Sequence, residues 1–245
     1  PTRNALENAF ASIENGNYGL AFGSGLAAID AVVKLLKPGD EVISTNDLYG
    51  GSFRLFTKIF QDFGIKFHFI GMENASNIES YINTNTKLIW VETPTNPMMS
   101  IIDIKAVSAI AKKHSVLLAV DNTFATPYLQ QPLDLGADIV MHSATKYLGG
   151  HSAVVFGVIC AAKPMIQKIF SSEYMTLGAC ISPNDAWLVL RGLRTLPIRL
   201  EKISATTETV IQFLKNHPKV DYVLYPFDKD FPQYDLATSQ MRGSG

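Results

Sequence analysis

Charged residues are scarce in this sequence, and no stretch is strongly basic or acidic. Of the 245 residues, 21 are lysine or arginine and 22 are aspartate or glutamate, which leaves a formal charge of −1. The charged share of 18% is below the roughly 25% of an average soluble domain. Because a near-neutral chain without a basic run binds nucleic acid and anionic membranes poorly, we expect neither as a partner. We expect another subunit to cover part of this weakly charged surface.

Long apolar runs and paired cysteines are missing as well. The longest uninterrupted apolar stretch, Ala153 to Ala162, has ten residues, about half of what a membrane-spanning helix needs. Cys160 and Cys180 stand alone, without Cys-x-x-Cys or Cys/His spacing, which predicts buried reduced thiols in a cytoplasmic protein. The five histidines show no ligand spacing, so we expect no metal site.

Short apolar segments alternate with amphipathic ones along the chain. The pattern predicts strands over 41–44, 66–70, 88–91, 116–120 and 139–141, and helices over 26–36 and 52–63 and after Asp103. Strands that are apolar on both faces and separated by helices indicate an α/β fold with a mainly parallel, doubly wound sheet. A longer helical stretch over 183–216, followed by 220–224, predicts the passage into a second, smaller domain.

In open α/β sheets, ligands bind beyond the carboxyl ends of the strands. The segment Gly23-Ser24-Gly25-Leu26 leads into a predicted helix, where backbone N–H groups and the helix dipole favour a phosphate. With Ala28 and Asp47 it also fits a dinucleotide-binding pattern, so a nicotinamide-dependent dehydrogenase is an alternative. A plain tight turn is the structural alternative.

Three further strand ends carry candidate residues. Asp121 follows a buried strand, where it could form a turn, hold a metal or pair with a protonated ring nitrogen; the missing histidine spacing disfavours the metal, and a turn and a functional role stay open. Lys146 lies between small hydroxyl residues and two glycines, which is typical of a partly buried lysine that forms a Schiff base. Tyr49 precedes two glycines and is placed to stack on a flat ligand or to pack on its own helix. The segment after Gly150 lacks the last glycine of a hydrolase nucleophile elbow, so we reject a hydrolase.

Taken together, the four strand ends favour one cofactor. Pyridoxal phosphate (PLP) needs a lysine for its aldehyde, an acidic partner for its pyridinium nitrogen and an anion site. A dehydrogenase leaves Lys146 and Asp121 without a role. We therefore favour PLP over a nicotinamide cofactor.

Several segments, in order along almost the whole chain, resemble the PLP-dependent enzymes of cysteine and methionine metabolism, in the cystathionine γ-lyase and γ-synthase branch. The matching segments are 1–7, 24–28, 49–51, Val91-Glu92-Thr93-Pro94-Thr95-Asn96-Pro97, 121–124, Ser143-Ala144-Thr145-Lys146-Tyr147 and 184–200. The lysine motif and Thr-Pro-Thr-Asn-Pro are the most specific of them.

The resemblance implies a role for each matching residue. Lys146 would bind PLP covalently and take the substrate's α-proton, and Asp121 would pair with the pyridinium nitrogen. Tyr49 would stack on the ring and assist proton transfer near the leaving sulfur. The remaining implied contacts are Asn96 to the phenolic oxygen, Thr123 to the ring face, Gly25, Leu26, Ser143 and Thr145 to the phosphate, and Arg54 to the distal end of the substrate.

The resemblance also implies the architecture. We expect an aspartate-aminotransferase-like fold (fold type I), with a PLP-binding large domain over residues 1–191. Residues 192–245 would form a connecting helix and the start of a truncated C-terminal α/β domain. The N-terminal arm of the family would precede Pro1, and the arginine that binds the substrate α-carboxylate would lie beyond Gly245. The family implies a homotetramer, a dimer of dimers with shared active sites.

The activity implied by the resemblance is γ-elimination from a sulfur amino acid, which converts cystathionine to cysteine, 2-oxobutanoate and ammonia in transsulfuration. Cystathionine γ-synthase is the nearest alternative, followed by cystathionine β-lyase and methionine γ-lyase. Gly51 stands where methionine γ-lyases usually carry cysteine, which disfavours that activity. An NAD-dependent dehydrogenase and a non-catalytic binding protein on the same fold are alternatives of other classes.

Overall fold

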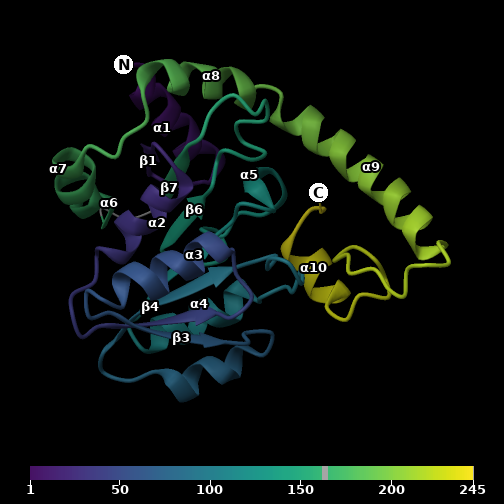
Figure 1. The fold of residues 1–245 in the computed structure, drawn as a ribbon, viewed down its shortest axis with the longest axis horizontal. Coiled ribbons are helices and arrows are strands. Elements are labelled where there is room, and N and C mark those ends of the chain that lie inside the picture. Colours follow the sequence, from purple (N-terminus) through teal and green to yellow (C-terminus); the bar gives the residue numbers. More distant parts are fainter. Residues whose placement is uncertain (162–164, 245) are drawn as a thin grey trace.

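The computed structural model describes residues 1–161 and 165–244, which form a seven-stranded sheet flanked by helices (Figure 1). The strands are β1 (Tyr18–Phe22), β2 (Glu41–Thr45), β3 (Lys66–Ile70), β4 (Thr86–Glu92), β5 (Leu117–Asp121), β6 (Ile139–His142) and β7 (Gly157–Ala161). Ala162, the end of the apolar run, and Gly245 lie outside the described residues.

The sheet is mainly parallel, as the sequence predicted. Its strand order is β1-β7-β6-β5-β4-β2-β3. The strands from β6 to β3 in this order run parallel to one another, whereas β7 is antiparallel to both of its neighbours. The carboxyl ends of β2, β3, β4, β5 and β6 therefore meet at one edge of the sheet.

Alternating side chains along each strand build two separate apolar layers. In β4, Leu88 and Trp90 pack on one face, and Ile89 and Val91 pack on the other. Because both faces of the inner strands β4, β5 and β6 are buried, these strands are largely apolar in the sequence.

Helices cover both faces of the sheet, and side chains cap the starts of several of them. The helices are α1 (Thr2–Ile13), α2 (Gly25–Val33), α3 (Gly50–Leu55), α4 (Ile104–Lys113), α5 (Thr126–Leu129), α6 (Met165–Ile169), α7 (Met175–Leu177), α8 (Pro183–Leu193), α9 (Leu196–Lys215) and α10 (Tyr234–Gln240), with π-helical segments η1 (Phe56–Phe60) and η3 (Phe170–Tyr174) and the 3₁₀ helix η2 (Ala75–Tyr81). Helices α2 and α6 with η1 cover the face that carries Trp90. Helix α4 and η2 cover the opposite face, on which α1 and α8 pack over β1 and β7.

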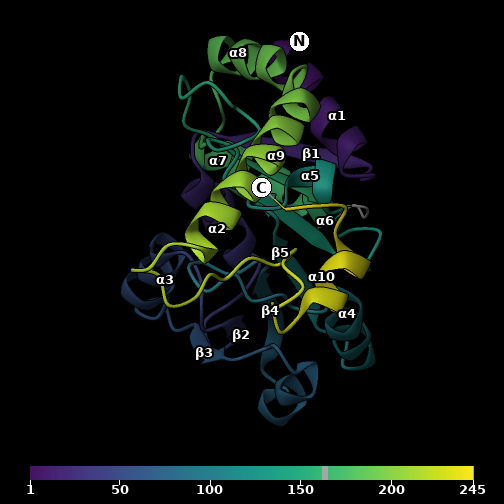
Figure 2. The ribbon, with the colours of Figure 1, turned by 90° about the vertical axis from the view of Figure 1, so that its right-hand side faces the viewer.

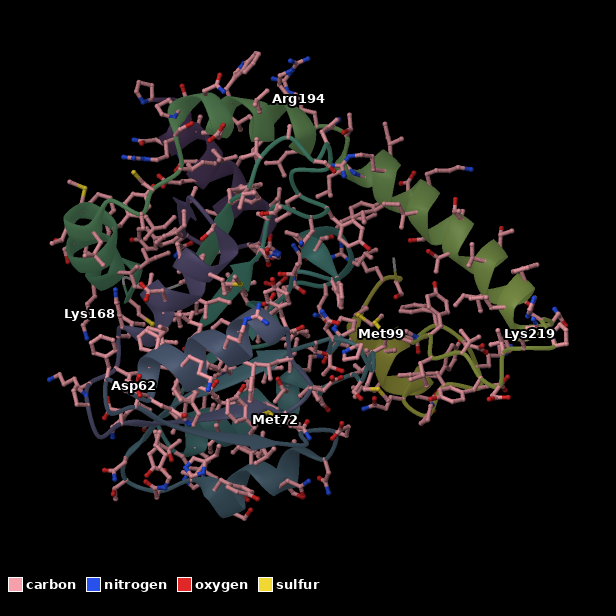
Figure 3. All side chains as sticks on the ribbon, viewed as in Figure 1. Asp62, Met72, Met99, Lys168, Arg194 and Lys219 are labelled. Carbon is pink, nitrogen blue, oxygen red and sulfur yellow. The ribbon has the colours of Figure 1, made fainter. Side chains whose placement is uncertain are left out.

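The chain leaves the sheet along α9 and returns to it in α10 (Figures 1 and 2). Arg194 and Lys219, which precede and follow α9, mark the extent of this excursion in Figure 3. On its return, the side chain of Gln233 bonds to both backbone groups of Ile101. Gln240 likewise bonds to the Ile104 N–H and the Ile102 carbonyl group. The segment after α9 therefore packs back onto the connection between β4 and α4.

Most predicted elements are confirmed, and the differences concern three of the predicted helices. The strand over 66–70 is β3, and the Asp103 side chain caps α4 by accepting the Ala106 N–H. The helix predicted over 26–36 ends at Val33, and that over 52–63 is replaced by α3 followed by η1. The stretch over 183–216 is two helices, because a turn at Arg194 and Thr195 separates α8 from α9.

Two further expectations concern cysteine and membranes. Cys160 is buried, but Cys180 is only partly buried, so the prediction of two buried thiols is wrong for Cys180. Cys180 lies outside the strands and forms only an isolated bridge to Phe22. Over the described ranges, none of the helices has both the length and the apolar character of a membrane span.

Candidate active site at the carboxyl end of the sheet

A cavity of 610 Å³ lies at the edge where the parallel strands end. It brings together nine of the ten residues singled out from the sequence, although they come from segments spread over more than 120 residues. These are Gly25, Leu26, Tyr49, Asn96, Asp121, Thr123, Ser143, Thr145 and Lys146. Arg54 does not line this cavity; it is exposed in the last turn of α3, and its role stays a prediction.

The start of α2 forms one wall of the cavity. Ser24 caps this helix by accepting the Ala27 N–H. A Cβ atom at Gly25 would lie 2.8 Å from the Ser143 Oγ atom, and one at Gly157 would lie 2.4 Å from the Ser24 carbonyl oxygen. The two glycines therefore allow β7 and the segment after β6 to approach the helix start. The first backbone N–H groups of a helix have no intrahelical partner, which makes this wall suited to an anion.

Asp121, the last residue of β5, places a buried carboxyl group in the cavity. Its Oδ1 atom accepts both the backbone N–H and the hydroxyl group of Thr123. Burial raises the pKa of Asp121, and the two bonds from Thr123 and the nearby His142 oppose this rise. Among the described residues no hydrogen bond to Oδ2 is found, so this oxygen is available to a donor in the cavity.

A buried polar network lies next to Asp121, on the following residue Asn122 and at the end of the neighbouring strand β6. The ring of His142, at the end of β6, pairs with Glu14, which also accepts the side-chain N–H of Asn122 at 3.2 Å. The Asn122 side chain then exchanges hydrogen bonds with Gln130. This network could not be predicted from the sequence, because Glu14 precedes Asn122 and His142 by more than 100 residues.

Tyr49 precedes α3 at the mouth of the cavity, and its ring lies against Gly51. A Cβ atom at Gly51 would lie 2.2 Å from the Tyr49 ring, so any side chain there would force the ring to move. The Tyr49 backbone N–H donates a hydrogen bond of 2.8 Å to Oε2 of Glu92. Glu92 also lines the cavity. We missed Glu92 as a candidate, although it follows an apolar strand in the same way as Asp121.

Burial sets the charge state of Glu92. Its side chain lies beside Asp121, because the last residues of β4 and β5 are direct neighbours in the sheet. Burial raises the pKa of Glu92, and the negative charges of Asp121 and Asp47 raise it further, whereas the Tyr49 N–H lowers it. Two carboxyl groups so close together cannot both ionise easily.

Lys146 lies in the turn after β6, and its side chain is exposed, which differs from the partial burial expected from its neighbours in the sequence. It lines both the strand-end cavity and an open groove beside α9, so this side of the cavity is open to solvent. The hydroxyl group of Thr145 both donates to and accepts from the backbone of Phe156. Thr145 is therefore already engaged in holding the turn.

Arg199 of α9 holds the same turn from outside. Its guanidinium group donates to the carbonyl oxygens of Tyr147 at 2.7 Å and Gly192 at 3.0 Å, and to the Thr195 hydroxyl group at 3.0 Å. Gly150 has a φ of +70°, and a Cβ atom there would lie 2.2 Å from the guanidinium carbon. Glycine at position 150 therefore allows the left-handed backbone conformation and leaves room for the Arg199 guanidinium group.

Comparison with known proteins identifies the family. The sequence matches the profile described as "Cys/Met metabolism PLP-dependent enzyme" over residues 1–245. The chain belongs to this family. PLP is therefore its cofactor, and the dehydrogenase alternative is set aside.

Individual relatives carry more than one name. The chain is 46% identical to a cystathionine γ-lyase of Bacillus subtilis (strain 168), over the whole chain and 65% of that protein. It is also 46% identical to a cystathionine γ-synthase of Mycobacterium leprae (strain TN), over the whole chain and 63% of that protein. The chain thus spans just under two thirds of the length of these relatives.

A solved structure confirms the fold. The crystal structure of a cystathionine γ-lyase from Lactobacillus plantarum, complexed with L-serine, has a TM-score of 0.98 and 42% identity to this chain. The match covers all of this chain and 64% of that one. The expected α/β fold of type I is therefore confirmed.

The residues of the cavity fit PLP. The start of α2 offers N–H groups to a phosphate, Asp121 offers a buried oxygen to a protonated ring nitrogen, and Lys146 offers an amine. These are the three kinds of group that PLP requires.

Proposed function

We propose that the intact protein cleaves the bond between the γ-carbon and sulfur of cystathionine. The overall reaction consumes water and yields cysteine, 2-oxobutanoate and ammonia. The observation that supports this function is that one cavity holds Lys146, Asp121 and the start of α2 in a chain of this family. The relative from Bacillus subtilis, 46% identical to this chain, is itself named a cystathionine γ-lyase.

The residues divide the chemistry among them. PLP supplies an aldehyde that an amine can attack and a ring that draws electrons from the substrate's α-carbon. Lys146 carries the cofactor, and its Nζ atom then takes the α-proton of the substrate. Oδ2 of Asp121 holds the proton on the ring nitrogen. The N–H groups of Gly25 and Leu26 and the Ser143 hydroxyl group bind the phosphate.

The other candidate residues position the ring and the substrate. Tyr49 stacks on the ring and moves a proton near the leaving sulfur, and Asn96 binds the phenolic oxygen. Thr123 lies at the ring face and holds Asp121 in place through its two hydrogen bonds. Arg54 does not line the cavity, so it would reach the distal end of the substrate only from outside. The Thr145 hydroxyl group already bonds to the Phe156 backbone, so it would bind phosphate only by sharing this hydroxyl group.

Cystathionine γ-synthase is the second candidate function, because a γ-synthase is as similar to this chain as a γ-lyase is. In that reaction cysteine replaces the γ-substituent of an activated homoserine. The residues of the cavity serve both reactions equally, since both remove the α-proton and lose a γ-substituent.

Product analysis distinguishes the two functions. The intact, PLP-loaded protein is incubated with cystathionine in one reaction, and with O-acetylhomoserine or O-succinylhomoserine plus cysteine in others. A γ-lyase releases 2-oxobutanoate and cysteine from cystathionine, whereas a γ-synthase forms cystathionine. Pyruvate and homocysteine from cystathionine would instead identify a β-lyase.

We also propose that the intact protein is a cytoplasmic homotetramer, with a domain division at residues 191 and 192. The low charged share of 18% and the free cysteines support this proposal. The division at 191 and 192 falls within α8. Sedimentation of the intact protein tests the tetramer, and a monomer at micromolar concentration would contradict it.

A further inference from the structure

One carboxyl group of the cavity has no role in the proposed reaction. Glu92 is buried and lines the cavity beside Asp121. It belongs to β4, an inner strand of the sheet. A buried acid without a cationic partner is costly, so its presence at this place calls for a physical reason.

The contact that Glu92 makes connects it to the start of α3. Its Oε2 atom accepts the Tyr49 backbone N–H at 2.8 Å, across 43 residues of sequence. Tyr49 directly precedes α3, and within the described part of the chain no side chain caps the start of this helix. The bond therefore attaches the segment after β2 to the end of β4, at the point where the Tyr49 ring enters the cavity.

We infer that Glu92 is a positioning residue, whose carboxyl group holds the Tyr49 backbone and thereby sets the place of the Tyr49 ring in the cavity. The inference rests on the proposed function, in which this ring stacks on the cofactor. The tight contact between the Tyr49 ring and Gly51 supports this inference, because this contact limits how the ring can adjust if the backbone moves.

Glu92 fulfils this role as a neutral acid. The charged and titratable groups that face it are Asp121 on β5, Asp47 after β2 and, across the cavity, Lys146. Two bonds from Thr123 favour the ionised form of Asp121, so Asp121 ionises before Glu92, and Glu92 keeps its proton. A neutral carboxyl group still accepts a hydrogen bond through its carbonyl oxygen. Of the two neighbouring carboxyl groups at the ends of β4 and β5, only Asp121 then carries a negative charge.

The test compares Glu92→Gln and Glu92→Ala in the intact protein, with Glu41→Gln as a matched control. Glutamine keeps the acceptor and the neutral state, whereas alanine removes the acceptor. Glu41 is also buried but lies at the opposite end of the sheet, in the first position of β2. The first readout is backbone hydrogen exchange of residues 46–50 in the cofactor-free protein, which depends on neither PLP nor substrate.

We expect Glu92→Ala to speed exchange at Tyr49 about tenfold or more, and Glu92→Gln to restore protection. In the PLP-loaded protein, we expect kcat to fall about 10- to 100-fold in Glu92→Ala, as a small misplacement can cause. Glu92→Gln should recover most of this loss and leave the pH midpoint of the visible cofactor band unchanged. Glu41→Gln should leave kcat and the pH midpoint of the cofactor band unchanged.

Three outcomes would overturn the inference: unchanged exchange in Glu92→Ala, faster exchange without loss of kcat, or equal damage in Glu92→Gln and Glu92→Ala. If Glu92→Ala fails to fold, the shorter Glu92→Asp replaces it with the same expectations. Failure of the proposed function shows itself separately, as a wild-type protein without a visible cofactor band or without products. Exchange at Tyr49 still decides whether Glu92 holds the backbone in that case.

Discussion

Two buried glutamates at opposite ends of the same sheet have opposite electrostatic surroundings. Glu41 begins β2, and three side chains surround its carboxylate: Asn83 at 2.9 Å, His68 at 2.6 Å and Lys66 at 3.4 Å. These donors, Asn83 first and His68 next, lower the pKa of Glu41 to about 2.

Glu92 ends β4 and has one backbone donor and two acidic neighbours, so its pKa is raised instead. At the amino end of the sheet the carboxylate is fully paired and stabilises the fold. At the carboxyl end, acidic groups lie together at a cost in stability. Perturbed acids of this second kind are typical of functional sites.

The largest effect is expected at the carboxyl end, from Asp121→Asn. The amide cannot hold a proton on the ring nitrogen as a carboxylate does, so we expect kcat of the intact protein to fall about 10²-fold or more. The matched control is Asp138→Asn at the amino end of β6, where the side chain accepts the Leu118 N–H. Steady-state kinetics should show no loss of kcat in Asp138→Asn. Equal losses in both variants would contradict the predicted difference between the two ends of the sheet.

At the amino end, Glu41→Gln should affect stability instead of catalysis. Because the folded pKa is below the unfolded value of 4.5, the stabilisation is complete above pH 4.5 and disappears as the pH falls toward 2. We expect a loss of about 2 kcal/mol at pH 7, less than the full shift because Lys66 is exposed. Urea unfolding at pH 7 and pH 4 measures it, and a constant difference between the two would contradict the assignment.

For Glu92→Gln the pH dependence has the opposite sign. The folded pKa is above the unfolded value, so the contribution of Glu92 is favourable below pH 4.5 and is lost as the pH rises through the folded pKa. In the cofactor-free protein, wild type should therefore lose up to about 1.4 kcal/mol per pH unit relative to Glu92→Gln between pH 5 and 8. Thermal unfolding across this range measures the trend. A difference that stays flat would mean that Glu92 is ionised in the fold.

The smallest effect concerns the turn that carries Lys146. Arg199→Ala removes the donors to Tyr147 and Gly192, and we expect it to lower the free energy of unfolding by about 1 to 2 kcal/mol. Hydrogen exchange of residues 147–150 should also become faster. Arg194→Ala, at an exposed arginine in the preceding turn, is the control. Unchanged exchange in Arg199→Ala would show that α9 does not hold the turn.

Much of the fold was predictable from local pattern. The strands that became β2 to β6 read as apolar runs between helical segments, and the cap at Asp103 was visible in the sequence. The antiparallel direction of β7 was not predictable, because an apolar run carries no information about strand direction. The division of residues 183–216 into two helices could have been predicted, because Pro197 lies in the first turn of α9 and proline favours a helix start.

The parts of the candidate site that were predictable from the sequence are the single residues at strand ends. Nine of the ten chosen residues share the cavity, since parallel strands bring their ends together. Glu92 was missed because its meaning depends on its neighbour Asp121 across the sheet. Neither the engagement of Thr145 by Phe156 nor the support of the Lys146 turn by Arg199 is visible without the folded chain.

The central claim is that chemistry takes place at the carboxyl end of the sheet, on Lys146. Borohydride reduction of the intact, PLP-loaded protein, followed by mass analysis of its peptides, tests this claim most directly. We expect the visible band to disappear and one pyridoxyl group to be found on Lys146. A protein that takes up no PLP, or a label on another lysine, would contradict it.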